Sequence, residues 1–280
     1  MSQIGNSGSE HSIPIPGRDS GTLRIAWAAA TDTGHKRVAN EDSFLAEPPL
    51  FAVADGMGGH AAGDLASAAV VKRLSEAINS DFMSADQIER ALEGATADID
   101  AIAGESELGV GTTVTGAVLS LQDGEAYFAV FNIGDSRVYS FENNALSQIT
   151  TDHSVVQELV DSGLLTKDEA EIHPDNNIIT RAVGFHSQPT PDLWMLPVRS
   201  GLRLLICSDG LTKEISDERI RFHLAASLPA RETATSLVDA ALAAGGRDNI
   251  TTIIVDVLEG PLGSELENTV PKRATPESLA

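Results

Sequence analysis

The sequence predicts an α+β fold in which antiparallel sheets are flanked by helices. Extended-type segments follow one another in runs, two helical segments are consecutive between residues 62 and 103, and the strict strand–helix alternation of a parallel sheet is absent. The chain has 280 residues, of which 42% are hydrophobic, so it can bury a full core. We therefore expect one large domain.

Strands are predicted where β-branched and aromatic residues cluster, at residues 23–30, 50–54, 112–119, 125–133, 137–141, 203–208 and 250–258. The pair Asn143-Asn144 is typical of a hairpin turn. Apolar residues at helical spacing predict helices within 65–78 and 88–102, and a last helix over about 231–244 that ends at Gly245-Gly246. Capping boxes are expected at Ser84 with Gln87 and at Thr166 with Glu169.

Both ends of the chain are rich in small and polar residues. We expect residues 1–21 and 259–280 to be mobile tails around a globular domain at 22–258. The start has neither a basic segment nor an apolar one after it, and no apolar stretch approaches the roughly 18 residues that a membrane span requires. These features predict a cytoplasmic protein without a membrane span.

The formal net charge is −22, from 19 basic and 41 acidic residues. This balance argues against nucleic acid or an anionic membrane surface as the main partner, because both need clustered Lys and Arg. The one cysteine, Cys207, lies in an apolar run where a buried small side chain is expected, and it excludes a disulfide within the chain.

The stretch LFAVADGMGGHAAGD, residues 50–64, leads an apolar strand into an aspartate and a glycine-rich turn. Its glycines fit the G-x-G-x-x-[GA] spacing of a dinucleotide loop. However, Asp55 at the mouth of the turn would repel a phosphate, whereas its carboxylate and the next carbonyl suit a hard cation. Alone, Asp-Gly is an ordinary turn signal, so other residues must decide.

Aspartates at the ends of predicted strands recur along the chain. Asp55 in VADG, Asp135 in NIGDSR and Asp209 in ICSDG each lie where a strand ends, and Asp248 in GGRDNITTIIV lies just before a strand. RVANEDS adds Glu41 and Asp42. Carboxylates at several strand ends can converge on one sheet edge, where cations must neutralise them. Oxygen ligands favour Mg²⁺ or Mn²⁺, and no Cys/His spacing predicts a zinc site.

The ordered motifs TGHKRVANEDS, DGMGGH, GTTVTGAV, IGDSRVY, CSDGLTKEIS and GGRDNITTIIV resemble those of the bacterial type 2C, or PPM-type, metal-dependent serine/threonine protein phosphatases. The resemblance covers about residues 22–258. It implies a four-layer αββα fold, with an antiparallel β-sandwich flanked by helices on both faces and a centre of two Mn²⁺ or Mg²⁺ ions at one end. Bacterial members also have a weaker third-metal site.

The resemblance implies roles for single residues. Asp55 resembles the aspartate that bridges the two metals, Gly56 supplies a carbonyl ligand, and Asp209 and Asp248 complete the carboxylates of the first metal. Asp135, with Asp209, matches the third-metal site. Arg37 matches the arginine that holds the substrate phosphate, and Glu41 and Asp42 match acidic positions that act through bound waters.

The general acid is less clear from the sequence. Animal members carry a histidine directly after the DG pair, where this chain has Met57. His60 is a candidate for the role, and a metal-bound water is the alternative. The segment at about 151–185 resembles the flap of the family, from which His153, His173 and Asn177 could reach substrate; an ordinary helical excursion is the simpler interpretation.

The predicted function is hydrolysis of phosphoserine and phosphothreonine on proteins, by direct attack of a hydroxide that bridges the metals. The expected partners are phosphorylated proteins, themselves substrates of a serine/threonine kinase, and the expected state is a monomer. One alternative is a pseudophosphatase that binds phosphoproteins without hydrolysis. Another is a nucleotide-binding enzyme built on GMGGHA, which a binding titration without metal would distinguish.

Overall fold

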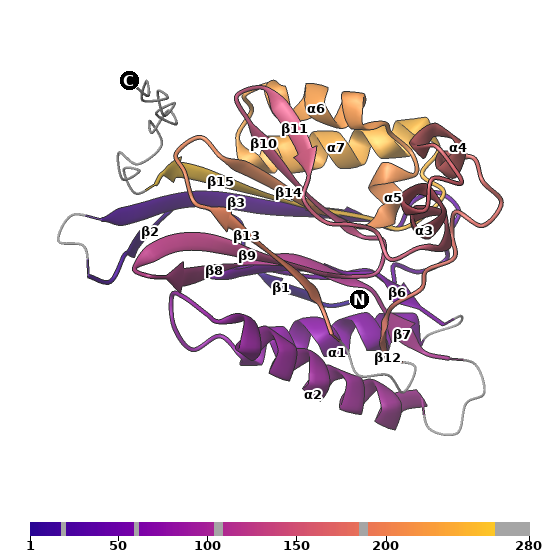
Figure 1. The fold of residues 1–280 in the computed structure, drawn as a ribbon, viewed down its shortest axis with the longest axis horizontal. Helices are drawn as coiled ribbons and strands as arrows, with labels where there is room; N and C mark the ends of the chain where they lie inside the picture. Colours follow the sequence, from indigo (N-terminus) through magenta and orange to yellow (C-terminus); the bar gives the residue numbers. More distant parts are fainter. Residues whose placement is uncertain (18–20, 59–61, 104–108, 185–189, 261–280) are drawn as a thin grey trace, which may run out of the picture.

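The computed structural model describes residues 1–17, 21–58, 62–103, 109–184 and 190–260. Two six-stranded sheets lie face to face in the middle of the molecule, with helices on the outer face of each (Figure 1). This is the four-layer αββα arrangement that the family resemblance implies. Within the described ranges, no helix is long and apolar enough to cross a membrane.

The first sheet is antiparallel except at one edge, where β1 runs parallel to β4. Its strands, in spatial order, are β1 (Gln3–Gly5), β4 (Ser43–Glu47), β5 (Leu50–Ala54), β8 (Val114–Gln122), β9 (Glu125–Ile133) and β13 (Asp192–Pro197). Helices α1 (Gly63–Glu76) and α2 (Ala85–Ala103) cover its outer face (Figure 1).

The second sheet is antiparallel throughout. Its strands, in spatial order, are β11 (Ala145–Gln148), β10 (Arg137–Glu142), β14 (Arg203–Cys207), β15 (Ile250–Glu259), β3 (Thr22–Asp32) and β2 (Gly8–Pro14). Helices α5 (Asp209–Thr212), α6 (Asp217–Ala225) and α7 (Ala230–Ala244) lie on its outer side (Figure 1).

Burial follows these layers. One apolar cluster fills the space between the two sheets and includes Phe51, Phe128 and Ile253. A second packs the first sheet against α1 and α2, and a third packs the second sheet against α6 and α7. The strands in the middle of each sheet are therefore covered on both faces.

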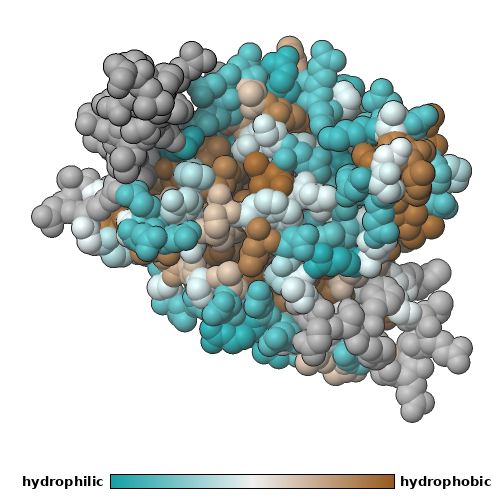
Figure 2. Space-filling view, in the orientation of Figure 1, coloured by the Kyte–Doolittle hydropathy of each residue, from teal (hydrophilic) through white to brown (hydrophobic). Residues whose placement is uncertain are grey.

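A small third sheet and the flap lie beside one end of the sandwich (Figure 1). The small sheet pairs β6 (Gly56–Met57), β7 (Gly111–Thr112) and β12 (Val183–Gly184). The flap carries α3 (Val155–Asp161) and α4 (Lys167–Glu171), and the expected capping box at Thr166 and Glu169 is present. Figure 2 shows apolar surface over these two helices, where Leu164 and Ile172 are exposed.

The expected turn and the last helix are also confirmed. Asn143 and Asn144 both have positive φ and join β10 to β11, and α7 ends at Gly245. The Ser84 box is only half formed. Gln87 Oε1 accepts a hydrogen bond from the Ser84 backbone N–H, but the Gln87 backbone N–H donates to the Ser84 carbonyl and, between these two described residues, not to the Ser84 hydroxyl oxygen.

The expectation of an N-terminal tail over residues 1–21 is wrong for the part that the structure describes. Strand β1 pairs with β4 and strand β2 pairs with β3, while Ile13 and Ile15 are buried in the cluster between the sheets. The predicted start of the domain at residue 22 is therefore too late. The predicted C-terminal tail lies almost entirely outside the described residues, which end at 260.

Candidate metal centre

The ends of four central strands bring aspartates to one side of the sandwich. Asp55 directly follows β5, Asp135 follows β9, Asp209 follows β14, and Asp248 comes shortly before β15. The antiparallel pairing of β14 with β15 places the last residue of one near the first residue of the other. All four aspartates line a cavity of about 810 Å³, together with Glu41, Gly56 and Arg37.

Asp42 lies behind this cavity and joins the two sheets. It precedes β4 of the first sheet, yet its Oδ2 accepts hydrogen bonds from the hydroxyls of Ser208 (2.8 Å) and Thr251 (2.6 Å) at the ends of β14 and β15. The side chain is 1% exposed, and its Oδ1 is buried without a hydrogen-bond partner.

The pKa values show how closely the carboxylates are crowded. Burial raises the pKa of Asp42 to about 7, although the hydrogen bonds from Thr251 and Ser208 lower it. Repulsion from Asp209 and Asp248 raises it further. Burial and repulsion from Asp209 raise the pKa of Asp135 to about 7. The pKa of Asp55 is raised well above its usual range by burial and by repulsion from the other aspartates, Asp42 first. Such a cluster attracts cations.

Two basic side chains enter the cluster. The guanidinium of Arg37 lies 2.7 Å from Asp248 Oδ2, and the ammonium of Lys213 pairs with Asp209 Oδ2. The hydrogen bond to Asp248 raises the pKa of Arg37. Burial alone would lower the pKa of Lys213, but attraction to Asp209, Asp135 and Asp55 outweighs it and raises that pKa. Both side chains are therefore charged at neutral pH.

The donor set fits a hard divalent cation, because carboxylates and a backbone carbonyl are the ligands that Mg²⁺ and Mn²⁺ prefer. Asp209 Oδ1, like Asp42 Oδ1, is buried without a hydrogen-bond partner. However, no three His, Cys, Asp or Glu side chains of the described ranges are already drawn around one point. The fit therefore rests on the chemistry of the donors.

The glycines of the two DG pairs allow the site loops to pack closely. A Cβ at Gly56 would lie 2.2 Å from the carbonyl oxygen of Gly63 and 2.7 Å from that of Glu41. A Cβ at Gly210 would lie 1.9 Å from the carbonyl oxygen of Asn249. Close backbone packing therefore requires glycine at both positions. The sequence suggested a different reason, namely access of a metal ion to the turn.

Asn249 and Thr113 fix these loops, and sequence reasoning did not single out either residue. The Asn249 amide accepts a hydrogen bond from the Glu41 N–H (2.8 Å) and donates to the carbonyls of Thr33 and Ala39. Thr113 exchanges hydrogen bonds with the backbone of Asp55. Lys213 was also missed, although its position four residues after Asp209 indicates a helical ion pair.

Comparison with known proteins supports the resemblance seen in the motifs. A family model described as protein phosphatase 2C matches residues 34–247. The chain belongs to the protein phosphatase 2C family.

Several members of this family are similar over most of the chain. The serine/threonine protein phosphatase PstP of Mycobacterium tuberculosis is 40% identical over 248 residues, which are 86% of this chain and 47% of PstP. The chain thus spans about half the length of that relative. The serine/threonine phosphatase stp of Listeria monocytogenes is 35% identical over 239 residues, which are 81% of this chain and 93% of stp.

A solved structure has the same fold. The catalytic domain of PstP, solved in complex with two manganese ions, superposes with a TM-score of 0.75 at 38% identity and covers 85% of this chain and all of that one. The chain therefore shares the fold of the PstP catalytic domain, and that PstP structure contains two manganese ions.

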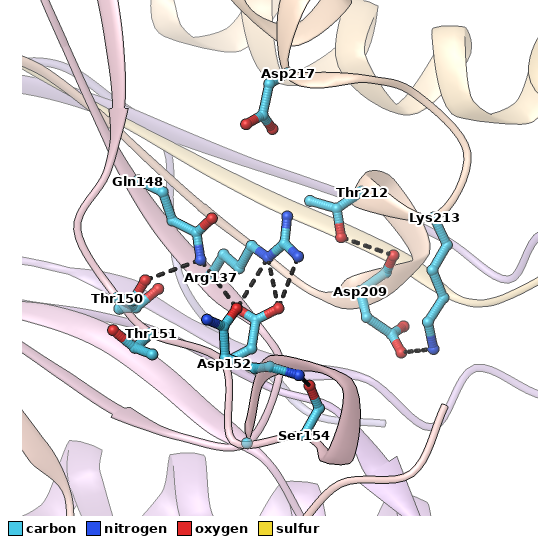
Figure 3. Close-up of polar contacts among 12 residues, drawn as sticks. Arg137, Gln148, Thr150, Thr151, Asp152, Ser154, Asp209, Thr212, Lys213 and Asp217 are labelled. Carbon is cyan, nitrogen blue, oxygen red and sulfur yellow. Dashed lines mark hydrogen bonds and ion pairs between the residues drawn. The ribbon is translucent and has the colours of Figure 1, made fainter. Parts of the chain in front are cut away.

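In this phosphatase 2C chain the root of the flap is tied to the loop that carries Asp135. Arg137 contacts both carboxylate oxygens of Asp152, and Gln148 donates a further hydrogen bond to Asp152 Oδ1 (3.0 Å; Figure 3). The N–H of Gly134 donates to His153 Nδ1 (3.0 Å), and the N–H of His153 donates to the Gly134 carbonyl (2.9 Å).

Of the histidines that the sequence suggested for this family member, the two that the structure describes, His153 and His173, do not line the cavity. His153 is buried at the flap root beside Asp192, and His173 accepts a hydrogen bond from the Asp175 backbone. Asn177 does line the cavity, as does Met57. His60, the candidate general acid, lies outside the described residues.

Proposed function

We propose that this chain is a metal-dependent serine/threonine protein phosphatase, which hydrolyses phosphoserine and phosphothreonine on other proteins. The observation that carries the proposal is the convergence of Asp55, Asp135, Asp209 and Asp248 on one cavity that Arg37 also lines. The names of the relatives PstP and stp, both serine/threonine phosphatases, support it.

Two divalent ions, Mn²⁺ or Mg²⁺, would be held by the carboxylates of Asp55, Asp209 and Asp248 and by the Gly56 carbonyl. When bound, these ions would lower the pKa of a coordinated water to near neutral and screen the charge on the reacting phosphate. Glu41 lines the cavity and Asp42 is buried behind it, and we expect both to order ligands and waters without direct ligation.

We expect Arg37 to bind the substrate phosphate. Its side chain is 52% exposed at the cavity wall, and its ion pair with Asp248 holds the guanidinium beside the metal carboxylates. A guanidinium offers two parallel N–H donors, which match two oxygens of a phosphate. The pair with Asp248 thus orients the group before substrate arrives.

No feature favours the pseudophosphatase alternative, since every expected metal carboxylate among the described residues lines the cavity. The nucleotide-binding alternative is opposed by the fold, which is not the parallel sheet of a dinucleotide domain. Partnership with a serine/threonine kinase, a monomeric state, a cytoplasmic location and the role of His60 as general acid stay predictions.

Hydrolysis of a phosphothreonine peptide, measured with and without chelator, tests the function. We expect no turnover in excess EDTA, recovery with Mn²⁺ or Mg²⁺, and loss of nearly all turnover in the folded Asp55→Ala, Asp209→Ala and Asp248→Ala variants. Asp98→Ala, which removes a carboxylate that pairs with Arg73 and does not line the cavity, is the matched control and should retain turnover. Full activity in chelator, or stable binding of metal with no hydrolysis of phosphoserine or phosphothreonine peptides, would reject the proposal.

A further inference from the structure

Lys213 places a positive charge of the chain itself inside the carboxylate cluster. It follows the short helix α5, four residues after Asp209, so its side chain points back along the helix to that carboxylate (Figure 3). Its ammonium pairs with Asp209 Oδ2, its side chain is 30% exposed, and it lines the same cavity as Asp55, Asp135 and Asp248.

The ion pair gives the two oxygens of Asp209 different surroundings. Oδ1 is buried and has no hydrogen-bond partner, so it is free to ligate an ion beside Asp55 and Asp248. Oδ2 is already engaged by Lys213. Asp135, 7% exposed, lies near enough to repel Asp209 and to attract Lys213. The ammonium therefore already supplies one positive charge to the two carboxylates to which the family resemblance assigns a third metal ion.

We propose that the ammonium of Lys213 replaces a third metal ion between Asp135 and Asp209, so that this chain binds two divalent ions and not three. This inference rests on the proposed metal centre, and it limits the number of metal ions bound there to two. An ion bound to Asp209 Oδ2 would lie within a few ångströms of the ammonium, where repulsion between cations is strong at the low effective dielectric of a protein. The four-carbon stem of lysine is flexible, so a metal could instead displace it; the ion count decides between these outcomes.

The test is the number of Mn²⁺ ions bound by the full chain, measured by equilibrium dialysis and elemental analysis over a range of free Mn²⁺. We expect the wild type to saturate at two ions. Lys213→Met keeps the length of the side chain and removes the charge, so it should bind a third ion, with an affinity increased about tenfold or more over the wild type. Lys213→Arg keeps the charge and should stay at two.

Two further variants control the experiment. Lys36→Met removes a lysine that lines the same cavity but has no carboxylate partner among the residues described, and it should stay at two ions. Adding Asp135→Asn to Lys213→Met should return the count to two, because the third ion then lacks a ligand. A thermal melt of each variant identifies any that fail to fold.

Three ions on the wild type, or a count that stays at two in folded Lys213→Met, would overturn the inference. The binding measurement uses Mn²⁺ alone and no phosphorylated substrate. A wild type that binds two ions and gains a third in Lys213→Met, yet hydrolyses no phosphopeptide, supports the inference while the proposed function fails. A wild type that hydrolyses phosphopeptide and binds three ions overturns the inference alone.

Discussion

Arg137 donates hydrogen bonds to both carboxylate oxygens of Asp152, with nitrogen–oxygen distances of 2.7 to 3.0 Å. Arg137 also donates to the Tyr139 hydroxyl, which in turn donates to Asp217 at the start of α6. Asp152 is 9% exposed. This network connects the loop of Asp135, the flap root and the start of α6, so it fixes these three segments relative to one another.

Replacing Asp152 by alanine should destabilise the fold strongly, because it leaves the charge of Arg137 in a largely buried position without its partner. Loss of one member of a buried ion pair costs about 3–5 kcal/mol of unfolding free energy. We expect a loss at the lower end of that range, since the Arg137 side chain is 27% exposed. Chemical denaturation in saturating Mn²⁺ measures it.

The matched control is Asp98→Ala. Arg73 also contacts Asp98 through two nitrogens, but both side chains are more than 30% exposed. An exposed pair contributes about 0–1 kcal/mol, so this variant should change stability little. Equal losses for Asp152→Ala and Asp98→Ala would show that the flap-root network does not act as a buried unit.

Stability in chelator should fall as the pH rises through neutrality. The folded protein raises the pKa of Asp42 and of Asp135 to about 7, whereas an unfolded aspartate titrates at about 3.9. Because folding favours the protonated forms, their contribution is complete below about pH 4 and is lost as the pH rises through about 7. Urea unfolding in EDTA from about pH 6 to about pH 8 should therefore show decreasing stability.

Asp42→Asn isolates the contribution of one group. The amide oxygen can accept the same hydrogen bonds from Ser208 and Thr251, and it carries no charge at any of these pH values. We expect a smaller loss of stability between the two pH limits than in the wild type. Parallel pH profiles for wild type and variant would mean that the crowding of carboxylates does not govern the dependence.

Arg37→Lys should weaken substrate binding more than it slows the chemical step. Lysine keeps the positive charge but loses the paired N–H donors, and a hydrogen bond to a charged group contributes about 1.5–3 kcal/mol. We expect KM for a phosphothreonine peptide to rise about tenfold or more, with a smaller change in kcat. Steady-state kinetics at saturating Mn²⁺ measures both. A variant with the wild-type KM would show that Arg37 serves only its pair with Asp248.

The sequence allowed the strands of the middle of each sheet to be predicted, because their apolar runs reflect burial on both faces. It failed for strands that depend on distant partners. Residues 1–17 have the composition of a tail, but Trp27 donates a hydrogen bond to the Asn6 carbonyl, and Gly8 packs so closely that a Cβ there would meet the Trp27 ring at 2.4 Å. Only the fold supplies those contacts.

The acidic residues of the site were predictable because each aspartate adjoins a strand, and strand ends meet at one edge. Their neighbours were not predictable in the same way. Ser208 lies in the motif CSDGLTKEIS, but its hydrogen bond to Asp42 joins positions 166 residues apart on different sheets, which the sequence does not reveal. His153 lies in the flap segment, from which the sequence suggested that it could reach substrate, but its side chain faces the flap root. Nothing in a sequence gives the direction in which a loop side chain points.

Asn249 offers a test of how far the cavity depends on its loops. Its side chain is held between two segments: the oxygen accepts from the Glu41 N–H, and the amino group donates to the carbonyls of Thr33 (2.9 Å) and Ala39 (3.0 Å). The residue is 5% exposed, so none of these bonds is readily replaced by water.

Asn249→Ala should destabilise the protein and also impair activity. One donor and two acceptors lose their partner, and each unsatisfied group costs about 1–3 kcal/mol, so we expect a loss of about 3 kcal/mol or more in unfolding free energy. Asn249→Asp restores the acceptor for Glu41 but not the donors to Thr33 and Ala39. If the amide positions the segment that carries Arg37 and Glu41, both variants should raise KM for phosphopeptide even at temperatures where they are fully folded. Lowered stability with an unchanged KM would limit Asn249 to a role in folding.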